Sequence, residues 1–140
     1  MKIYNYLDKA NECFKVAVNL YSFNYLNDKK ILFAIIRNLY DSGLSSISLF
    51  YEKIYKEKDI SIYEGNLDFM EYIDKNIVIV NKLKSILEKH RVSTVEFFRN
   101  DNLVICSENY SDLELIDNKK LMQYFKSVKL LLEAANVRGI

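Results

Sequence analysis

Apolar residues recur every three or four positions over four long stretches of the chain, which is the spacing of one face of an α-helix. In the first stretch this face carries Leu7, Ala10, Phe14 and Ala17. The chain contains no proline and only three glycines, so the strongest breakers of regular structure are almost absent. The pattern therefore predicts helices over residues 5–26, 28–58, 67–91 and 118–136, with a loop over residues 59–66.

The second of these stretches, residues 28–58, is apolar over much of its circumference and carries small residues such as Ser42 and Gly43 near its middle. A helix that is apolar on several sides is stable only when neighbours cover it. Small side chains let a neighbouring backbone approach closely. We therefore expect residues 28–58 to form the central helix, which Asn27 or Asp28 would cap, while Asp117 would cap the last helix.

The segment between the third and last helices loses the helical period and allows two interpretations. Val95, Phe97 and Phe98, a polar turn at residues 100–102, and then the apolar residues 103–106 favour a β-hairpin over residues 94–106. Alternatively, Ser93 and Glu96 match the spacing of a capping box, which would start a short helix here. The β-branched and aromatic content favours the hairpin.

The composition indicates one folded domain over residues 1–140. Half of the residues are apolar and 28% are charged, which is far from the composition of disordered chains. The formal charge of +1 argues against a broad electrostatic footprint on nucleic acid or on an acidic membrane. We predict an all-α fold, an antiparallel four-helix bundle, with a small β-hairpin before the last helix.

Few residues offer metal or redox chemistry. The chain has two cysteines, Cys13 and Cys106, and one histidine, His90, which are too few for a disulfide framework or a usual metal site. Both cysteines lie among apolar residues and are expected to fill space. No glycine-rich phosphate loop, charged leader or run of 18 apolar residues is present. We expect a cytoplasmic protein with no metal, no cofactor and no membrane association.

The tyrosine-rich antiparallel helices, the segment AIIRNLYDSGLSSISLF in the second helix and the pair Arg99-Asn100 after the third resemble the HEPN superfamily of small helical bundles. Catalytic members of that superfamily are metal-independent RNases with an arginine, often a polar residue after it, and a histidine four to six positions further on. Other members lack the motif and serve as partners of nucleotidyltransferases or as dimerising domains.

Arg99 and Asn100 match the front of that motif, but Cys106 stands where its histidine would be. A thiol with an ordinary pKa of about 8.5 is a poor acid and base for a ribose hydroxyl. His90 precedes Arg99 and would have to be brought back by the fold. The resemblance thus implies Arg99, Asn100 and His90 as candidate catalytic residues, with Cys106 as a further candidate.

Each candidate also has a plainer interpretation. His90 lies at the end of a helix, where a cation complements the helix dipole, although with Lys82 and Lys84 it could contact RNA. Arg99 could bind phosphate or simply be solvated. The acidic run after the hairpin is typical of a solvated loop that could dock a basic partner. This run contains Glu108, Asp112, Glu114 and Asp117.

We predict a non-catalytic HEPN-like interaction module, a homodimer that binds a nucleotidyltransferase or an RNA-handling protein. The first alternative is a metal-independent RNase with a divergent active site. The second alternative is an unrelated helical adaptor that uses its tyrosines and the acidic loop as a contact surface.

Overall fold

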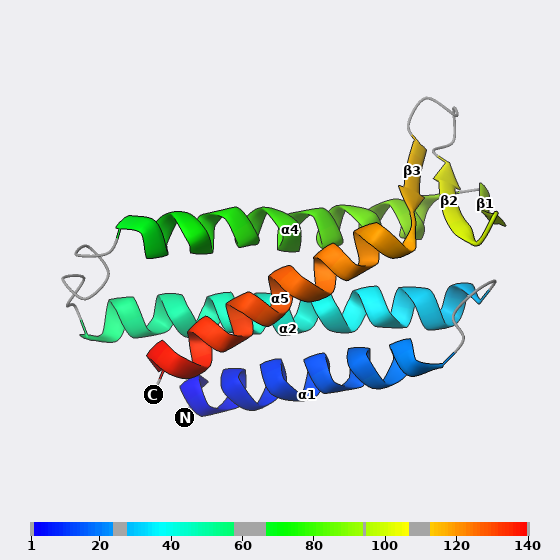
Figure 1. Cartoon of the computed structure of the whole chain (residues 1–140). Coiled ribbons are helices and arrows are strands. Elements are labelled where there is room, and N and C mark those ends of the chain that lie inside the picture. Colours follow the sequence, from blue (N-terminus) through cyan, green and yellow to red (C-terminus); the bar gives the residue numbers. More distant parts are fainter. Residues whose placement is uncertain (1, 24–27, 58–66, 94, 107–112, 140) are drawn as a thin grey trace.

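The computed structural model describes residues 2–23, 28–57, 67–93, 95–106 and 113–139 (Figure 1). Four helices carry most of these residues, and three short strands lie between the third and the last helix. The all-α prediction therefore holds only approximately. The elements are α1 (Lys2–Ser22), α2 (Lys29–Glu57), α4 (Leu67–Val92), β1 (Val95–Arg99), β2 (Asn102–Cys106), β3 (Leu113–Ile116) and α5 (Asn118–Gly139).

Helix α2 is the centre of the bundle, as its apolar circumference predicts. It packs against α1, α4 and α5 (Figure 1). Leu32, Ile35, Ile36 and Leu39 are fully or almost fully buried, and they belong to one core with residues of the other helices and of the sheet. The chain runs up and down the bundle, so both termini lie at the end opposite to the sheet (Figure 1).

The small residues of α2 mark two close approaches between helices. The Ser42 hydroxyl donates a hydrogen bond of 2.7 Å to the carbonyl oxygen of Ala10 on α1. A Cβ atom placed on Gly43 would lie 2.7 Å from Cγ2 of Val80 on α4, which is closer than real Cβ contacts. The prediction that small residues here permit close packing is confirmed.

Both predicted helix caps in the described residues are confirmed. The Asp28 carboxylate accepts a hydrogen bond of 3.2 Å from the Ile31 amide, and the Asp117 carboxylate accepts one of 2.8 Å from the Lys120 amide. Helix α5 extends to Gly139, three residues beyond the predicted end at residue 136.

The hairpin prediction is confirmed and the short helix is wrong. Strands β1 and β2 pair antiparallel with Arg99 opposite Asn102. The two turn residues between them, Asn100 and Asp101, have φ values of 52° and 66°, which is the left-handed region that such two-residue turns require. Glu96 cannot serve a capping box because it lies inside β1.

The acidic run after the hairpin is not a solvated loop where the structure describes it. Leu113–Ile116 form β3, which pairs antiparallel with β2, and Glu114 is 4% exposed. Its alternation of exposed and buried residues is that of a strand with one face on the core. The rest of the acidic run before Leu113 and the predicted loop 59–66 lie outside the described residues.

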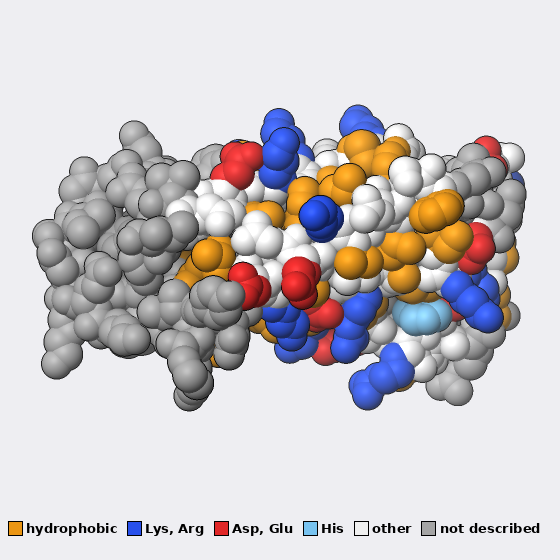
Figure 2. Space-filling model, turned by 90° about the horizontal axis from the view of Figure 1, so that it is seen from below, with side chains coloured by type: hydrophobic (Ala, Val, Ile, Leu, Met, Phe, Trp, Pro, Cys, Tyr) orange, Lys and Arg blue, Asp and Glu red, His pale blue; other side chains and the backbone are white. Residues whose placement is uncertain are grey.

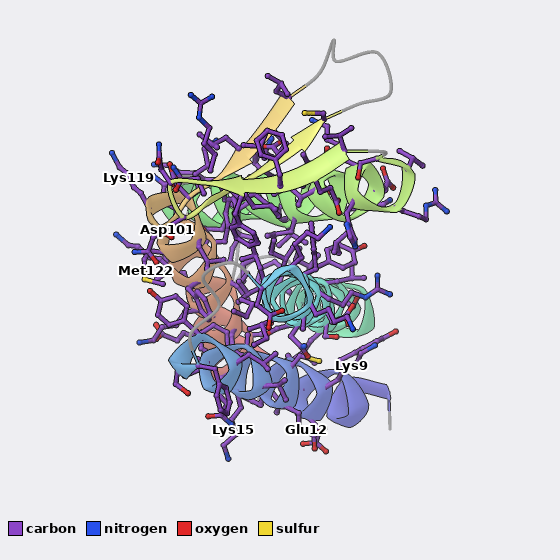
Figure 3. The ribbon with its side chains drawn as sticks, turned by 90° about the vertical axis from the view of Figure 1, so that its right-hand side faces the viewer. Lys9, Glu12, Lys15, Asp101, Lys119 and Met122 are labelled. Carbon is purple, nitrogen blue, oxygen red and sulfur yellow. The ribbon has the colours of Figure 1, made fainter. Side chains whose placement is uncertain are left out.

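The sheet lies over the C-terminal end of α4, on the side of the bundle away from α1 (Figure 3). Its strand order is β1-β2-β3. Strand register and burial define an inner face toward the helices, which carries Glu96, Phe98, Leu103, Ile105, Glu114 and Ile116. The outer face carries Val95, Phe97, Arg99, Asn102, Val104, Cys106, Leu113 and Leu115.

Candidate functional site

The inner face of the sheet carries two acidic side chains in one row. Glu96 on β1 and Glu114 on β3 both pair with Ile105 of the middle strand, so they flank it on either side. The side chains of Glu96 and Glu114 are 8% and 5% exposed. Buried carboxylates are costly unless cations and hydrogen bonds satisfy them. Each of these two has its own set of nitrogen-bearing partners.

Glu114 is held by lysines from two helices. Its Oε1 accepts hydrogen bonds from Nζ of Lys82 at 2.6 Å and from Nζ of Lys89 at 3.4 Å, both on α4. Nζ of Lys120 on α5 lies 4.0 Å from Oε2. Lys82 is therefore engaged in an ion pair and is not a free member of the predicted RNA-contacting patch.

Glu96 is held by His90 and, at longer range, by Lys29. Its Oε2 lies 2.5 Å from Nδ1 of His90, and its Oε1 lies 3.6 Å from Nζ of Lys29 at the start of α2. The His90 ring also stacks on Phe33 of α2, with ring centroids 3.6 Å apart and an interplanar angle of 16°. Three elements thus fix the position and the orientation of this imidazole.

His90 lies in the last turn of α4, as predicted. In addition to the helix dipole, it interacts with Glu96 and Phe33. Figure 2 shows its ring at the molecular surface with cationic side chains on either side. A carboxylate on Nδ1 selects the tautomer in which Nδ1 carries the proton and Nε2 is free to accept one. This is how a histidine is oriented to act as a base. The side chain of His90 is 40% exposed, so solutes can reach it.

A basic groove follows the same seam between α2 and α4. It has a volume of about 290 Å³ and is lined by Arg37, Tyr40, Lys84, Leu87, Glu88 and Arg91. Phe33 and Arg37 are one helical turn apart on α2, so the groove lies next to the His90 stack. Three cations and one carboxylate give its lining a net positive charge. An anion could therefore approach His90 along this groove.

The structure does not place Arg99 beside His90. Arg99 ends β1 on the outer face and is exposed, whereas His90 contacts Glu96 on the inner face. Asn100 is exposed in the hairpin turn. Within the described part of one chain, these three candidate residues therefore do not share a cleft. Cys106 is 4% exposed at the end of β2, which fits the expectation that it fills space.

Two side chains in the described part of the chain have shifted pKa values. Burial, followed by the charge of Asp41, raises the pKa of the Cys13 thiol, so this half-buried residue is a weaker nucleophile than a free cysteine. Burial, followed by the charges of Glu114 and Asp117, raises the pKa of Tyr124 to about 12. Among the described residues, no three His, Cys, Asp or Glu side chains gather as a metal site would require.

The outer face of the sheet is largely apolar, and part of it is exposed. Phe97 is 43% exposed, Leu115 is 40% exposed and Leu113 is 63% exposed. On this face Val104 lies between Phe97 and Leu115, and Cys106, which is 4% exposed, lies between Val95 and Leu113. Its only charge among the described residues is Arg99, at the hairpin end. Lys120 donates a hydrogen bond of 2.8 Å to the carbonyl oxygen of Leu115.

Sequence reasoning missed both buried glutamates. In the sequence, Glu96 is interpreted as a capping residue, and Glu114 as part of an acidic run that is solvated or docks a basic partner. The sequence signal for a strand at Glu114 is the alternation of Leu113–Ile116 with a period of two residues. This segment is only four residues long, and the acidic residues around it favour a loop instead. The cations that hold the two glutamates come from positions distant in the sequence, so their pairing is set by the fold.

In the part of the chain that the structure describes, no helix is long and apolar enough to cross a membrane. No protein-family model, curated protein or solved structure matches the chain. Its function must therefore be argued from the geometry above.

Proposed function

We propose that this chain is a helical interaction module of HEPN-like type that acts by binding, and that it forms a homodimer through the outer face of its sheet. The observation that carries the proposal is the exposure of Phe97, Leu113 and Leu115 on one face. Contiguous apolar surface of this kind typically marks an interaction site. The bundle of four long helices with α2 at its centre is in keeping with the resemblance to HEPN bundles.

A second copy of the chain is the partner that this face fits best. A twofold interface brings a surface patch against the same patch of the other copy, so charges at its centre would repel. The centre of the outer face is apolar, and its one described charge, Arg99, lies at the edge. The formal charge of +1 also adds little repulsion between two whole chains.

Sedimentation velocity over an about hundredfold range of concentration tests the dimer. We expect the natural chain to dimerise and the variant Phe97→Ser with Leu115→Ser to sediment as a monomer. A matched control is Val16→Ser with Val18→Ser on α1, because these valines are similarly exposed, at 43% and 46%. A natural chain that stays monomeric, or a Phe97/Leu115 variant that still dimerises, would refute the proposal.

A second candidate function, metal-independent RNA cleavage, is favoured by the way Glu96 holds His90. With Nδ1 donating to the carboxylate, Nε2 could take the proton of a ribose 2′-hydroxyl, whose oxygen would attack the adjacent phosphorus. The bond from phosphorus to the 5′-oxygen would break, and that oxygen would leave with a proton from water. Arg91 and Lys84 in the neighbouring groove would neutralise the phosphate charge.

Cleavage of a mixed-sequence RNA in the presence of a chelator separates the two candidates. The natural chain would be compared with His90→Ala and Arg99→Ala. Cleavage that His90→Ala abolishes would establish the RNase function with His90 as base, and loss in Arg99→Ala as well would indicate that two chains build the site. If the natural chain does not cut RNA, the binding function is the better supported one.

A further inference from the structure

A second groove runs along the other side of α4, where this helix faces α5. It has a volume of about 510 Å³, within the range of pockets that hold small organic ligands. The residues that line it are spaced by three or four positions on both helices, so it follows the seam between them. In Figure 1, α5 diverges from α4 as the two helices run away from the sheet.

The polar side chains of this groove favour anions. Lys75 of α4 and Lys126 of α5 supply two ammonium groups, and Gln123 and Ser127 supply an amide and a hydroxyl donor. No carboxylate is among the described residues that line it. The whole chain has 20 cationic and 19 acidic residues, so its charges nearly balance. The described residues that line this groove include two lysines and no acid, so its local charge is positive.

The groove between α2 and α4 differs in this respect. It contains Glu88, and Nε of Arg37 lies 3.7 Å from the Asp41 carboxylate, so two acids compete there for its cations. The α4–α5 groove has no such competitor in the described residues. Of the two grooves, the α4–α5 groove is therefore the better binding site for an anion.

The floor of the α4–α5 groove is apolar. Ile79 and Leu130 are half-buried and lie between the polar positions of the two helices. The methylene stems of lysines extend such a surface while their ammonium groups stay in water. A ligand that fills this groove would therefore have an apolar body as well as a charged head.

We propose that the α4–α5 groove binds a small organic acid, with its carboxylate held by Lys75 and Lys126 and its apolar body on Ile79 and Leu130. Ser127 and Gln123 can donate further hydrogen bonds to the carboxylate. The site uses no residue of the sheet, so it is independent of the dimer proposed above. Dimerisation and ligand binding can therefore fail separately.

Octanoate is a suitable probe because it joins a carboxylate to a short apolar chain. The full-length chain, labelled with ¹⁵N, would be titrated with octanoate and followed by its amide resonances. Inorganic phosphate tests charge without an apolar body, and octanol tests the apolar body without charge. We expect octanoate to bind most tightly of the three and to shift resonances within residues 75–79 and 123–130.

Two double variants make the test specific. Lys75→Gln with Lys126→Gln removes both ammonium groups from exposed positions, and we expect octanoate to bind roughly tenfold more weakly. Lys9→Gln with Lys15→Gln makes the same change in net charge on α1, where both side chains project into solvent (Figure 3), and should bind octanoate normally.

Several results would overturn the proposal. The site is absent if octanoate shifts no resonances in the two segments, or if octanol or phosphate binds as tightly as octanoate. Equal weakening in both double variants would show that net charge, and not this groove, attracts the ligand.

Discussion

The two faces of the small sheet depart from the arrangement that one-sided sheets usually have. Antiparallel sheets with one covered face commonly carry apolar residues inside and polar residues outside. Here the inner face includes the buried carboxylates of Glu96 and Glu114, whereas the outer face exposes Phe97, Leu113 and Leu115. Leu103, Ile105 and Ile116 still join the inner face to the core of the bundle, so the carboxylates add polar contacts to an apolar attachment, while apolar area on the outer face is left for another surface.

The inner charges specify where the sheet lies. Lys82 and Lys89 of α4 hold one edge strand through Glu114, and His90 holds the other through Glu96. A register shift of one residue would turn both carboxylates to the outer face and leave these cations unpaired. Buried ion pairs often add little net stability, so we infer that their role here is to select one position of the sheet.

Among the polar contacts of the inner face, the largest expected effect comes from removing the cations of Glu114. In Lys82→Met with Lys89→Met, a carboxylate that is 5% exposed keeps Lys120, at 4.0 Å, as its one cation among the described residues. We expect the free energy of unfolding to fall by about 3 kcal/mol, because an uncompensated buried charge is strongly destabilising. Urea unfolding followed by circular dichroism measures this change.

Adding Glu114→Leu to that variant is its control. An apolar residue in place of the carboxylate removes the unpaired charge, so most of the lost stability should return. If the triple variant is as unstable as the double variant, the methionines disturb packing and the ion pairs are not the cause.

The second effect concerns the other edge of the inner face. His90→Ala removes both the bond to Glu96 and the stack on Phe33, and we expect a loss of about 2 kcal/mol in the free energy of unfolding. Lys29→Ala removes a longer and more exposed contact, at 3.6 Å, and should cost less than about 1 kcal/mol. The same urea titration would be used. Equal losses would show that His90 has no special role in holding β1.

The third effect is a loss of stability at alkaline pH, which comes from Tyr124, a residue whose pKa is raised by burial and by the charge of Glu114 on the inner face. Burial and the charges of Glu114 and Asp117 raise the pKa of Tyr124 from 10.0 to about 12, so the folded chain keeps this proton where the unfolded chain loses it. Stability should be complete below pH 10 and should fall by about 1.4 kcal/mol per pH unit between pH 10 and pH 12. Tyr124→Phe should lack this component of the loss, whereas the remaining tyrosines titrate alike in both proteins. Parallel unfolding titrations at several alkaline pH values would show the difference.

The helices and the hairpin could be predicted because their signals are local. The period of apolar residues, the caps at Asp28 and Asp117 and the turn at Asn100-Asp101 each lie within a few residues of the feature that they determine. The central position of α2 followed from its apolar circumference and its small residues.

Strand β3 and the carboxylate clusters could not be predicted in the same way. Four residues are too few for a clear period, and acidic neighbours made this segment resemble a loop. Glu114 pairs with Lys82, which is 32 positions away in the sequence, and the ring of His90 stacks on Phe33, which lies on another helix. Pairings of this kind come from tertiary packing, and a single sequence does not encode them in any local pattern.

The smallest effect on folding is expected on the outer face. Phe97→Ser with Leu115→Ser should change the free energy of unfolding of the monomer by less than about 1 kcal/mol, because both side chains already contact water. Leu103→Ser with Ile105→Ser makes a comparable change on the inner face, where the two residues are 0% and 1% exposed, and should cost more than about 4 kcal/mol. Urea unfolding at low protein concentration measures both. Similar losses would mean that the two faces are equally buried in solution, in which case the apolar outer face would belong to the core of the chain and would not be free to bind a second copy.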